Sequence, residues 1–262
     1  MSIIGIWGED KSCKTTLALT FPKPLIFMEF DIGGFDRAIY RFQKDFDTKL
    51  IRYEAYPMPI QIGKFDPATL TVKPSKIIVG MKELFYHWLT RYIKHLENPE
   101  VASIVIDTAT LLYSITCDSY LQEKQEIQFD LNGNLLPNEK LRTQLLQVEY
   151  REPNNRMRGI IYNAKVYKKH LVLVHHARDE YGPVRQKDGT VAQGATGKRE
   201  RAGFATLGDS ADVIVHTYWD NKEQKPYCKV ELAEVKALEG MVFREPSYEI
   251  IDRTIKMLKG II

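Results

Sequence analysis

Four short apolar runs without polar–apolar alternation lie in the first two thirds of the chain. They are Ile3 to Trp7, Pro24 to Phe30, Ala102 to Ile106 and His170 to Val174. Turn-forming residues bound each run, a pattern typical of strands that are buried on both faces of a parallel sheet. Helix-like periodicity over residues 77–97, 108–127 and 154–168 separates the later runs. Alternating strands and helices predict a doubly wound α/β fold with a mostly parallel central sheet flanked by helices.

The last third of the sequence is richer in strand-like segments. We expect strands at Ala211 to Tyr218, Tyr227 to Ala233 and Met241 to Ile251, which extend the sheet as antiparallel hairpins. The closing segment, Asp252 to Ile262, has the apolar spacing of a short helix. The predicted fold class is therefore α/β, with antiparallel strands at the C-terminal side of the parallel sheet.

Two stretches interrupt this regular pattern. Residues 55–76 contain four prolines and are expected to form an irregular insertion. Residues 181–209 combine six glycines with many charged side chains and show little periodicity, so an irregular loop is expected there. Long segments of this kind inside a compact domain are usually functional or disordered. No repeat or linker divides the chain, and we expect a single domain over residues 1–262.

Composition narrows the class of protein without identifying it. Hydrophobic residues make up 44% of the 262 residues, which is enough for a sizeable core. No apolar run approaches the roughly 20 residues of a membrane span, and the first strand begins too early for a signal peptide, so we expect a cytoplasmic protein without a membrane partner. Cys13, Cys117 and Cys228 are scattered, which argues against a disulfide framework or a zinc site. The net charge of +3 does not by itself indicate nucleic-acid binding.

The segment GEDKSCKTT follows the first predicted strand and precedes a helix-like run. It meets the phosphate-loop pattern G-x-x-x-x-G-K-[ST] at every defined position except one, because Cys13 stands where the last glycine belongs. Such a loop binds a polyphosphate with main-chain N–H groups and the positive end of the following helix. We therefore predict that nine consecutive residues bind a nucleotide: Gly8, Glu9, Asp10, Lys11, Ser12, Cys13, Lys14, Thr15 and Thr16.

Two of these residues carry specific chemistry. Lys14 is expected to contact the β- and γ-phosphates, which also makes it part of the catalytic set, and the Thr15 hydroxyl is expected to bind Mg²⁺. Glycine normally lets the loop backbone approach the phosphates without a Cβ, so a small cysteine at position 13 is tolerated if its φ is negative, with a tighter fit. The alternative interpretation is an ordinary charged turn between a strand and a helix.

Residues suited to phosphate or metal chemistry follow the other predicted parallel strands. Asp107 is expected to hold Mg²⁺ through water, with a helix N-cap as the alternative. Glu29 and Asp31 are candidates to orient or deprotonate an attacking water, and Asp31 is preferred because it lies beside two glycines; turn capping is its alternative. Adjacent residues in a strand point to opposite faces, so only one of His175 and His176 can face the nucleotide, and His176 is preferred.

Basic residues are concentrated in the glycine-rich segment, namely Arg185, Lys187, Lys198, Arg199 and Arg201. On a flexible loop they suit contacts with a nucleic-acid backbone, and Tyr181 or Phe204 could stack on a base. Nearby acidic residues dilute this charge, so an ordinary solvated loop is the alternative.

Five segments, taken in order, resemble the RecA-like ATPase core: GEDKSCKTT, FPKPLIFMEFDIGG, SIVIDTAT, HLVLVHHARDEY and GDSADVIVH. More narrowly, the chain resembles short phage-encoded ATPases of single-strand annealing or recombination, described as the Sak group. The resemblance extends from Ile3 to about Ile251. It implies a RecA-like P-loop NTPase with ATP and Mg²⁺ as its ligands.

The resemblance also implies roles for single positions. Asp31 falls where this core has its catalytic carboxylate, and Asp107 matches its Mg²⁺-associated aspartate. His176 falls where bacterial recombinases carry a glutamine that couples the γ-phosphate to DNA binding, and residues 177–208 match the mobile DNA-binding loop. Lys236 resembles a lysine that reaches the nucleotide of a neighbouring subunit, which implies a homo-oligomer; an exposed strand lysine is the alternative.

The sequence leaves three functions open. The leading one is an ATP-dependent protein that binds single-stranded DNA in phage recombination, annealing or replication, with a phage single-strand-binding protein or replication proteins as further partners. The second is a nucleotide-binding scaffold or loader without useful hydrolysis, for which Cys13 and the short Asp31 side chain argue. A ring motor is the third, and it requires an arginine supplied by a neighbouring copy.

Overall fold

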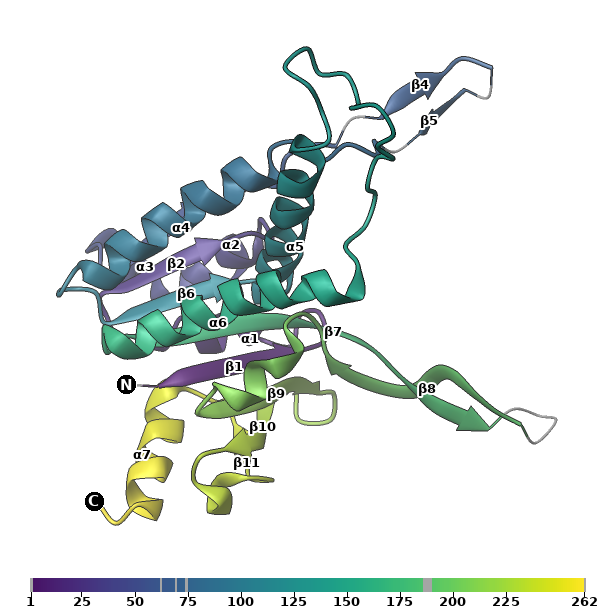
Figure 1. Ribbon diagram of the computed structural model, residues 1–262. Coiled ribbons are helices and arrows are strands. Elements are labelled where there is room, and N and C mark those ends of the chain that lie inside the picture. Colours follow the sequence, from purple (N-terminus) through teal and green to yellow (C-terminus); the bar gives the residue numbers. More distant parts are fainter. Residues whose placement is uncertain (1, 62, 69, 74, 186–189, 262) are drawn as a thin grey trace.

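A nine-stranded sheet forms the centre of the computed structural model, which describes residues 2–61, 63–68, 70–73, 75–185 and 190–261 (Figure 1). The strand order is β11-β10-β9-β1-β7-β6-β2-β3, and β8 pairs with β7 beside this path. All neighbours from β9 to β3 are parallel, whereas β10 and β11 run antiparallel. This arrangement confirms the predicted α/β class with a mostly parallel sheet and antiparallel C-terminal strands.

The strands of the sheet are β1 (Ile3–Gly8), β2 (Leu25–Glu29), β3 (Ile51–Ala55), β6 (Ser103–Asp107), β7 (His170–Arg185), β8 (Val191–Arg201), β9 (Val213–Asp220), β10 (Lys225–Ala233) and β11 (Val242–Arg244). The α-helices are α1 (Lys14–Ala18), α2 (Gly34–Ile39), α3 (Gln43–Asp47), α4 (Met81–Glu97), α5 (Ala109–Glu126), α6 (Arg151–Val166) and α7 (Tyr248–Leu258). Short 3₁₀ helices are η1 (Tyr40–Phe42), η2 (Gln147–Tyr150), η3 (Ala205–Asp209) and η4 (Lys236–Leu238). Within the described residues, no helix is long and apolar enough to cross a membrane.

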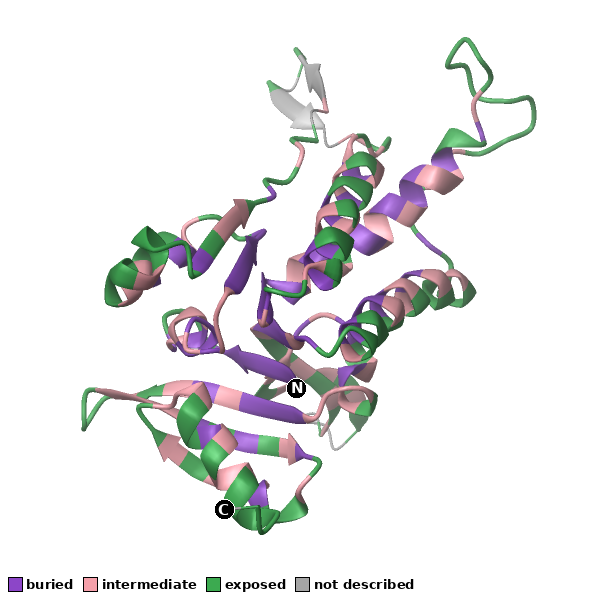
Figure 2. Ribbon diagram, turned by 90° about the vertical axis from the view of Figure 1, so that its left-hand side faces the viewer, coloured by how far each residue is buried: buried purple, intermediate pink, exposed green. Residues whose placement is uncertain are grey.

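Helices cover both faces of the sheet, and the apolar runs supply a core on each side (Figures 1 and 2). Successive strand residues point to opposite faces. In β2, Ile26 and Met28 pack with α4, α5 and α6, whereas Leu25 and Phe27 pack with α1, α2 and α7. All four side chains are fully buried, which explains why this run shows no polar–apolar alternation. Each contributes about 1.5–3 kcal/mol to stability by leaving water.

The C-terminal side differs from the prediction in two respects. β9 pairs parallel with β1, so antiparallel pairing on this side begins between β9 and β10 and continues between β10 and β11. The strand predicted to reach Ile251 ends at Arg244, and α7 already begins at Tyr248. The Ser247 hydroxyl caps α7 by accepting a hydrogen bond from Ile250 N at 3.4 Å.

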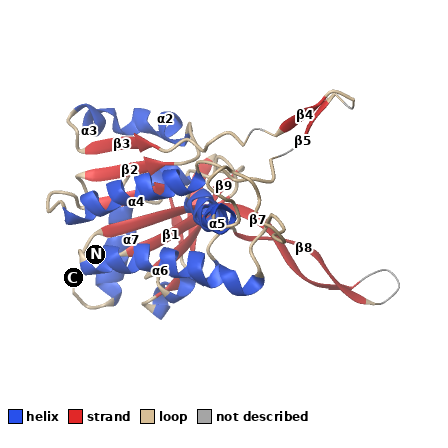
Figure 3. Cartoon of the chain, turned by 45° about the horizontal axis from the view of Figure 1, so that its top comes forward, coloured by secondary structure: helices blue, strands red, loops and turns tan. Residues whose placement is uncertain are grey.

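Two antiparallel ribbons project from the body of the protein (Figures 1 and 3). In the insertion over residues 55–76, β4 (Lys64–Asp66) pairs with β5 (Thr71–Lys73). β7 and β8 pair from Ala177 to Arg185, so most of the segment expected to be a loop is a ribbon instead. Among the described residues of this ribbon, none is buried between His176 and Arg185 or along β8. A strand without a buried face has no apolar periodicity to identify it, which is why the prediction of a loop is wrong.

Candidate functional site

A cleft of about 470 Å³ opens at the carboxyl ends of the parallel strands. The strands β1, β2 and β6 end at this edge, and β7 passes it at His176, as expected for the ligand site of an open α/β sheet. Of the residues singled out from the sequence, the cleft is lined by Asp10, Lys11, Ser12, Cys13, Lys14, Thr15, Thr16, Asp31, Asp107 and His176. Residues far apart in the chain are thus brought together where the sequence predicts a nucleotide.

The loop between β1 and α1 makes a turn that normally requires glycine. Cys13 has φ 66° and ψ 22°, in the left-handed region, so the condition of a negative φ is not met. For an L-residue this conformation costs about 1–2 kcal/mol. The loop therefore adopts at this position the left-handed turn that glycine favours, although Cys13 carries a Cβ.

The start of the same loop has no room for a side chain. A Cβ on Gly8 would lie 2.2 Å from Thr217 O and 2.7 Å from Ser12 Oγ. The Ser12 and Thr217 hydroxyls form a buried hydrogen bond of 2.9 Å. The loop is thereby fixed to β9 as well as to its own strand.

Lys14 lies inside the loop and is nearly buried. Its Nζ donates to Gly8 O at 2.9 Å and to Glu9 O at 2.6 Å. Burial lowers the pKa of the ammonium group, and the carboxylates of Asp10 and Asp107 oppose this shift. A positive charge held by neutral carbonyls at the wall of a cleft is available to a bound polyanion.

Thr15 and Asp107 form the centre of the candidate metal site. Thr15 Oγ1 donates to Asp107 Oδ2 at 2.7 Å. Desolvation raises the pKa of Asp107 to about 7, and the nearby Glu29 charge adds to this shift. A Cβ on Gly34 would lie 3.5 Å from both Thr15 Oγ1 and Asp107 Oδ2, so this glycine leaves the space beside the pair open.

This donor set fits Mg²⁺, because a hydroxyl and a carboxylate are the hard oxygen ligands that this ion takes beside substrate phosphates and water. Among the described residues, no group of three or more His, Cys, Asp and Glu side chains could hold a metal by itself. A cation bound at Thr15 and Asp107 thus needs phosphate or water oxygens to complete its coordination.

Glu29 does not line the cleft. Its side chain is 1% exposed, and both carboxylate oxygens are engaged. Oε1 accepts from Phe35 N at 2.8 Å, and Oε2 accepts from Tyr53 OH at 2.7 Å. The structure therefore gives Glu29 a positioning contact, in which it holds the first turn of α2 against the end of β2.

Asp31 and His176 face each other at the mouth of the cleft, with His176 Nε2 3.5 Å from Asp31 Oδ2. Both side chains are partly exposed. Since β7 lies between β1 and β6, His176 stands between the phosphate loop and Asp107. His176 N donates to Thr110 Oγ1 at 3.0 Å, which ties the end of the buried part of β7 to α5.

His175 points to the opposite side of the strand, as expected for adjacent residues. It is buried, and its Nδ1 lies 3.0 Å from Ala202 O. Because a carbonyl oxygen only accepts, Nδ1 carries the proton. Burial holds the pKa of His175 well below its ordinary value, so the ring is neutral.

The basic residues of the β7–β8 ribbon do not share one surface. Arg199 Nε donates to Glu9 Oε1 at 2.6 Å, and the same guanidinium contacts Asp179. Arg201 donates to the carbonyls of Phe204 and Ala205 at the base of the ribbon. The two remaining candidates on described parts of the ribbon, Arg185 and Lys198, are exposed, and Lys187 lies outside the described residues. Arg199 therefore links the ribbon to the phosphate loop.

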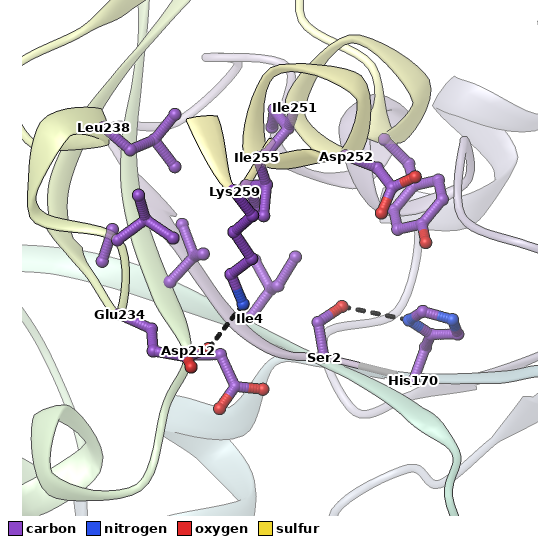
Figure 4. A pocket seen from close by; sticks show the side chains of 14 residues that line it. Ser2, Ile4, His170, Asp212, Glu234, Leu238, Ile251, Asp252, Ile255 and Lys259 are labelled. Carbon is purple, nitrogen blue, oxygen red and sulfur yellow. Dashed lines mark hydrogen bonds and ion pairs between the residues drawn. The ribbon is translucent and has the colours of Figure 1, made fainter. Parts of the chain in front are cut away.

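Lys236 lies at the other end of the sheet. It begins η4 directly after β10, which runs antiparallel, and it pairs with Glu239 at 2.8 Å. A smaller cavity of about 90 Å³ opens at this end, with Lys259 Nζ 3.4 Å from Glu234 Oε2 across it (Figure 4). No residue predicted to have a functional role lines that cavity. A nucleotide that Lys236 contacts would belong to another copy of the chain.

Six lining residues of the large cleft have no counterpart among the predicted site residues: Gly34, Arg37, Ala38, Tyr40, Arg41 and Thr108. Arg37, Tyr40 and Arg41, from α2 and η1, bring polar side chains to it. No motif marks them in the sequence. The available signal is the helical spacing of Phe35 and Ala38, which are both buried and so turn the arginines away from the core.

Similar solved structures include the following two proteins. A KaiC-like protein from Pyrococcus horikoshii OT3 has a TM-score of 0.45 and 12% sequence identity, over 93% of this chain and 84% of that chain. The RadB recombinase has a TM-score of 0.47 and 13% identity, over 93% of this chain and 86% of that chain. No protein-family model and no curated protein matches the sequence. The roles of the cleft residues therefore rest on the geometry of this chain.

Proposed function

We propose that this chain is a RecA-like P-loop ATPase that binds ATP with Mg²⁺ and hydrolyses it. The observation that carries this proposal is the convergence of Lys14, Thr15, Asp107 and Asp31 on one cleft of about 470 Å³. A cation, a hydroxyl–carboxylate pair and a second, exposed carboxylate are what binding and hydrolysis of a nucleoside triphosphate require.

Each residue has a separate task in this proposal. The main-chain N–H groups of the loop and Lys14 bind the β- and γ-phosphates, and Thr15 with Asp107 holds Mg²⁺, which neutralises developing charge when it is bound. Asp31 accepts a hydrogen bond from the attacking water and so orients it. The contact of 3.5 Å between His176 and Asp31 supports a role of His176 in positioning that carboxylate.

We further propose that the polymer partner is single-stranded DNA, bound by the β7–β8 ribbon, in phage recombination, annealing or replication. Two observations support this part. The ribbon continues directly from His176 at the cleft, and Arg199 returns from β8 to contact Glu9 of the phosphate loop. Exposed arginine and lysine side chains on a projecting ribbon suit phosphate contacts. A homo-oligomer, a phage single-strand-binding protein and replication proteins are part of the same proposal, as is action in the cytoplasm of the host.

Turnover of ATP by the wild type and by Lys14→Ala tests the hydrolysis proposal. We expect Mg²⁺-dependent turnover in the wild type and a loss of ATP affinity in Lys14→Ala, with Asp31→Asn binding ATP but turning it over slowly. Equal background rates in all three proteins would refute hydrolysis. Affinity for a labelled oligonucleotide, measured with and without ATP at several salt concentrations, tests the DNA proposal, and no binding at low salt in either state would refute it.

A scaffold or loader that binds ATP without turning it over is the second candidate. Asp31 favours it, because this short carboxylate is already in contact with His176. In that case calorimetry gives ATP binding to the wild type while its turnover equals that of Lys14→Ala.

A further inference from the structure

Two arginines stand on the wall of the cleft opposite the phosphate loop. Arg37 lies in α2 and Arg41 in η1, and both line the cleft together with Lys14 and Asp31. The backbone at Ile39 and Tyr40 keeps right-handed helical angles, so α2 continues into η1 without a break. Residues four apart on such a helix lie on the same face, about one turn from each other.

Core packing and one hydrogen bond hold this wall in place. Phe35 and Ala38 are buried in the core beneath α2. The Glu29 carboxylate accepts from Phe35 N at 2.8 Å and so fixes the start of the helix. The face that carries Arg37 and Arg41 is thereby directed toward the cleft.

The two guanidinium groups have different neighbours. Arg37 Nη1 is 3.2 Å from the point where a Cβ on Gly33 would stand, which places it in the loop that carries Asp31. Arg41 Nε donates to Tyr40 OH at 2.8 Å, and its guanidinium carbon lies 5.4 Å from the centre of that ring. Burial raises the pKa of the Cys13 thiol, and the nearby Arg41 charge opposes this rise. Arg41 therefore lies toward the start of α1.

Both charges are available to an anionic ligand. Among the residues that the structure describes, neither Arg37 nor Arg41 forms a direct ion pair with a carboxylate. A hydrogen bond from Lys225 lowers the pKa of the exposed Glu245, and the Arg41 charge contributes to this lowering. A guanidinium group binds phosphate oxygens with two parallel N–H donors, which gives it both affinity and orientation. Two unpaired arginines one helical turn apart, facing a phosphate loop, match an extended polyphosphate.

We infer that Arg37 and Arg41 bind the triphosphate from the same chain that supplies the phosphate loop. Arg37 contacts the γ-phosphate beside Asp31, and Arg41, nearer Cys13, contacts the phosphates that ATP and ADP share. This inference rests on the proposed ATP site. It makes the site's arginines internal to one chain, so turnover requires no arginine from a neighbouring copy.

Affinities of ATP and ADP, measured by calorimetry with Mg²⁺, test the two contacts separately. For Arg37→Ala we expect ATP to bind about 10- to 100-fold more weakly while ADP affinity changes little, because only ATP has a γ-phosphate. For Arg41→Ala we expect ATP and ADP to weaken by a similar factor. The lysine variants at both positions keep the charge and are expected to recover part of the loss. Arg253→Ala on α7 is the matched control and is expected to bind both nucleotides like the wild type.

Mixing two variants tests whether the arginine acts within its own chain. We combine Lys14→Ala with Arg37→Ala at several ratios and measure turnover. If Arg37 acts on a neighbouring chain's nucleotide, mixed assemblies regain activity above the weighted mean of the two variants. We expect no gain at any ratio.

The outcomes separate this inference from the proposed function. If the folded wild type does not bind ATP, the proposed function fails and the inference with it. If the wild type binds ATP and both alanine variants keep ATP affinity within twofold, the inference alone is refuted. A gain of activity on mixing would likewise refute action within one chain. Circular dichroism and urea unfolding of each variant verify that losses of affinity do not come from unfolding.

Discussion

Replacing Cys13 with glycine changes the one position at which the phosphate loop departs from its pattern. Cys13 has φ 66° and ψ 22°, a conformation that costs an L-residue about 1–2 kcal/mol and costs glycine nothing. Glycine also gains conformational freedom in the unfolded chain, which destabilises the variant by about 0.5–1 kcal/mol. The difference predicts that Cys13→Gly is more stable than the wild type by about 0.5–1 kcal/mol.

Urea unfolding without nucleotide measures this difference. The midpoint is expected to rise while the dependence of the unfolding free energy on urea stays the same, because the surface exposed on unfolding does not change. Calorimetry with Mg²⁺ and ATP gives the functional consequence. We expect affinity to rise, since no Cβ then stands between the loop backbone and the phosphates.

Two further substitutions at position 13 serve as controls. Cys13→Ala keeps the Cβ and removes the thiol, so it is expected to lack the gain in stability. Cys13→Val places a β-branched side chain in the left-handed region and is expected to be the least stable of the three. If Cys13→Gly is less stable than Cys13→Ala, the loop does not hold this residue in a left-handed conformation and the reasoning is refuted.

Three other predictions follow from individual contacts. The pKa of Asp107 is raised to about 7 in the folded protein from an ordinary value near 3.8, so the folded state binds more protons and its stability falls as the pH rises through this window. Asp107→Asn is expected to remove this pH dependence of stability. It is also expected to abolish the release of protons when Mg²⁺ and ATP bind near pH 7, which calorimetry in buffers of different ionisation enthalpy measures. Glu9→Arg or Arg199→Glu alone is expected to change how strongly ATP alters the affinity for an oligonucleotide. The double variant is expected to restore part of the wild-type ATP effect. Equal ATP effects in the single and double variants would contradict a link through this ion pair. Gln125→Leu is expected to lower the free energy of unfolding by about 1–3 kcal/mol. The buried Gln125 amide accepts a hydrogen bond from Ile78 N and donates to the carbonyls of Lys76 and Arg142, and leucine removes all three bonds. Urea unfolding measures this loss, and an unchanged midpoint would contradict it.

The buried strands could be predicted from the sequence because burial on both faces requires a continuous run of apolar residues, which is visible without tertiary information. β2 and β6 consist almost wholly of apolar residues, and each ends in a carboxylate, Glu29 or Asp107. The spacing of Lys14 and Thr15 after β1 then suffices to predict the phosphate loop. Parallel strands share one carboxyl edge, so the approach of Asp107 to Thr15 also follows from the fold class.

The remaining elements could not be predicted because their residues are placed by contacts distant in sequence. In β3 only Ile51 is buried, so the strand has too little apolar pattern to identify it. The ribbon continues from β7 with no buried described residue after His175. Arg37 and Arg41 become cleft residues only once α2 packs across the end of β2, which depends on Glu29 and the buried Phe35.

The placement of β7 gives the proposed coupling between nucleotide and DNA a physical basis. β7 lies between β1 and β6, so His176 stands between the phosphate loop and Asp107, and the same strand continues without interruption into the ribbon. The ribbon then returns along β8, and Arg199 contacts the Glu9 carboxylate of the loop at 2.6 Å. Lys14 donates to the main-chain oxygen of this same Glu9. A phosphate group that draws Lys14 Nζ away from Glu9 O therefore acts on the residue that anchors Arg199, and a ligand on the ribbon that takes Arg199 acts back on the loop by the same contact.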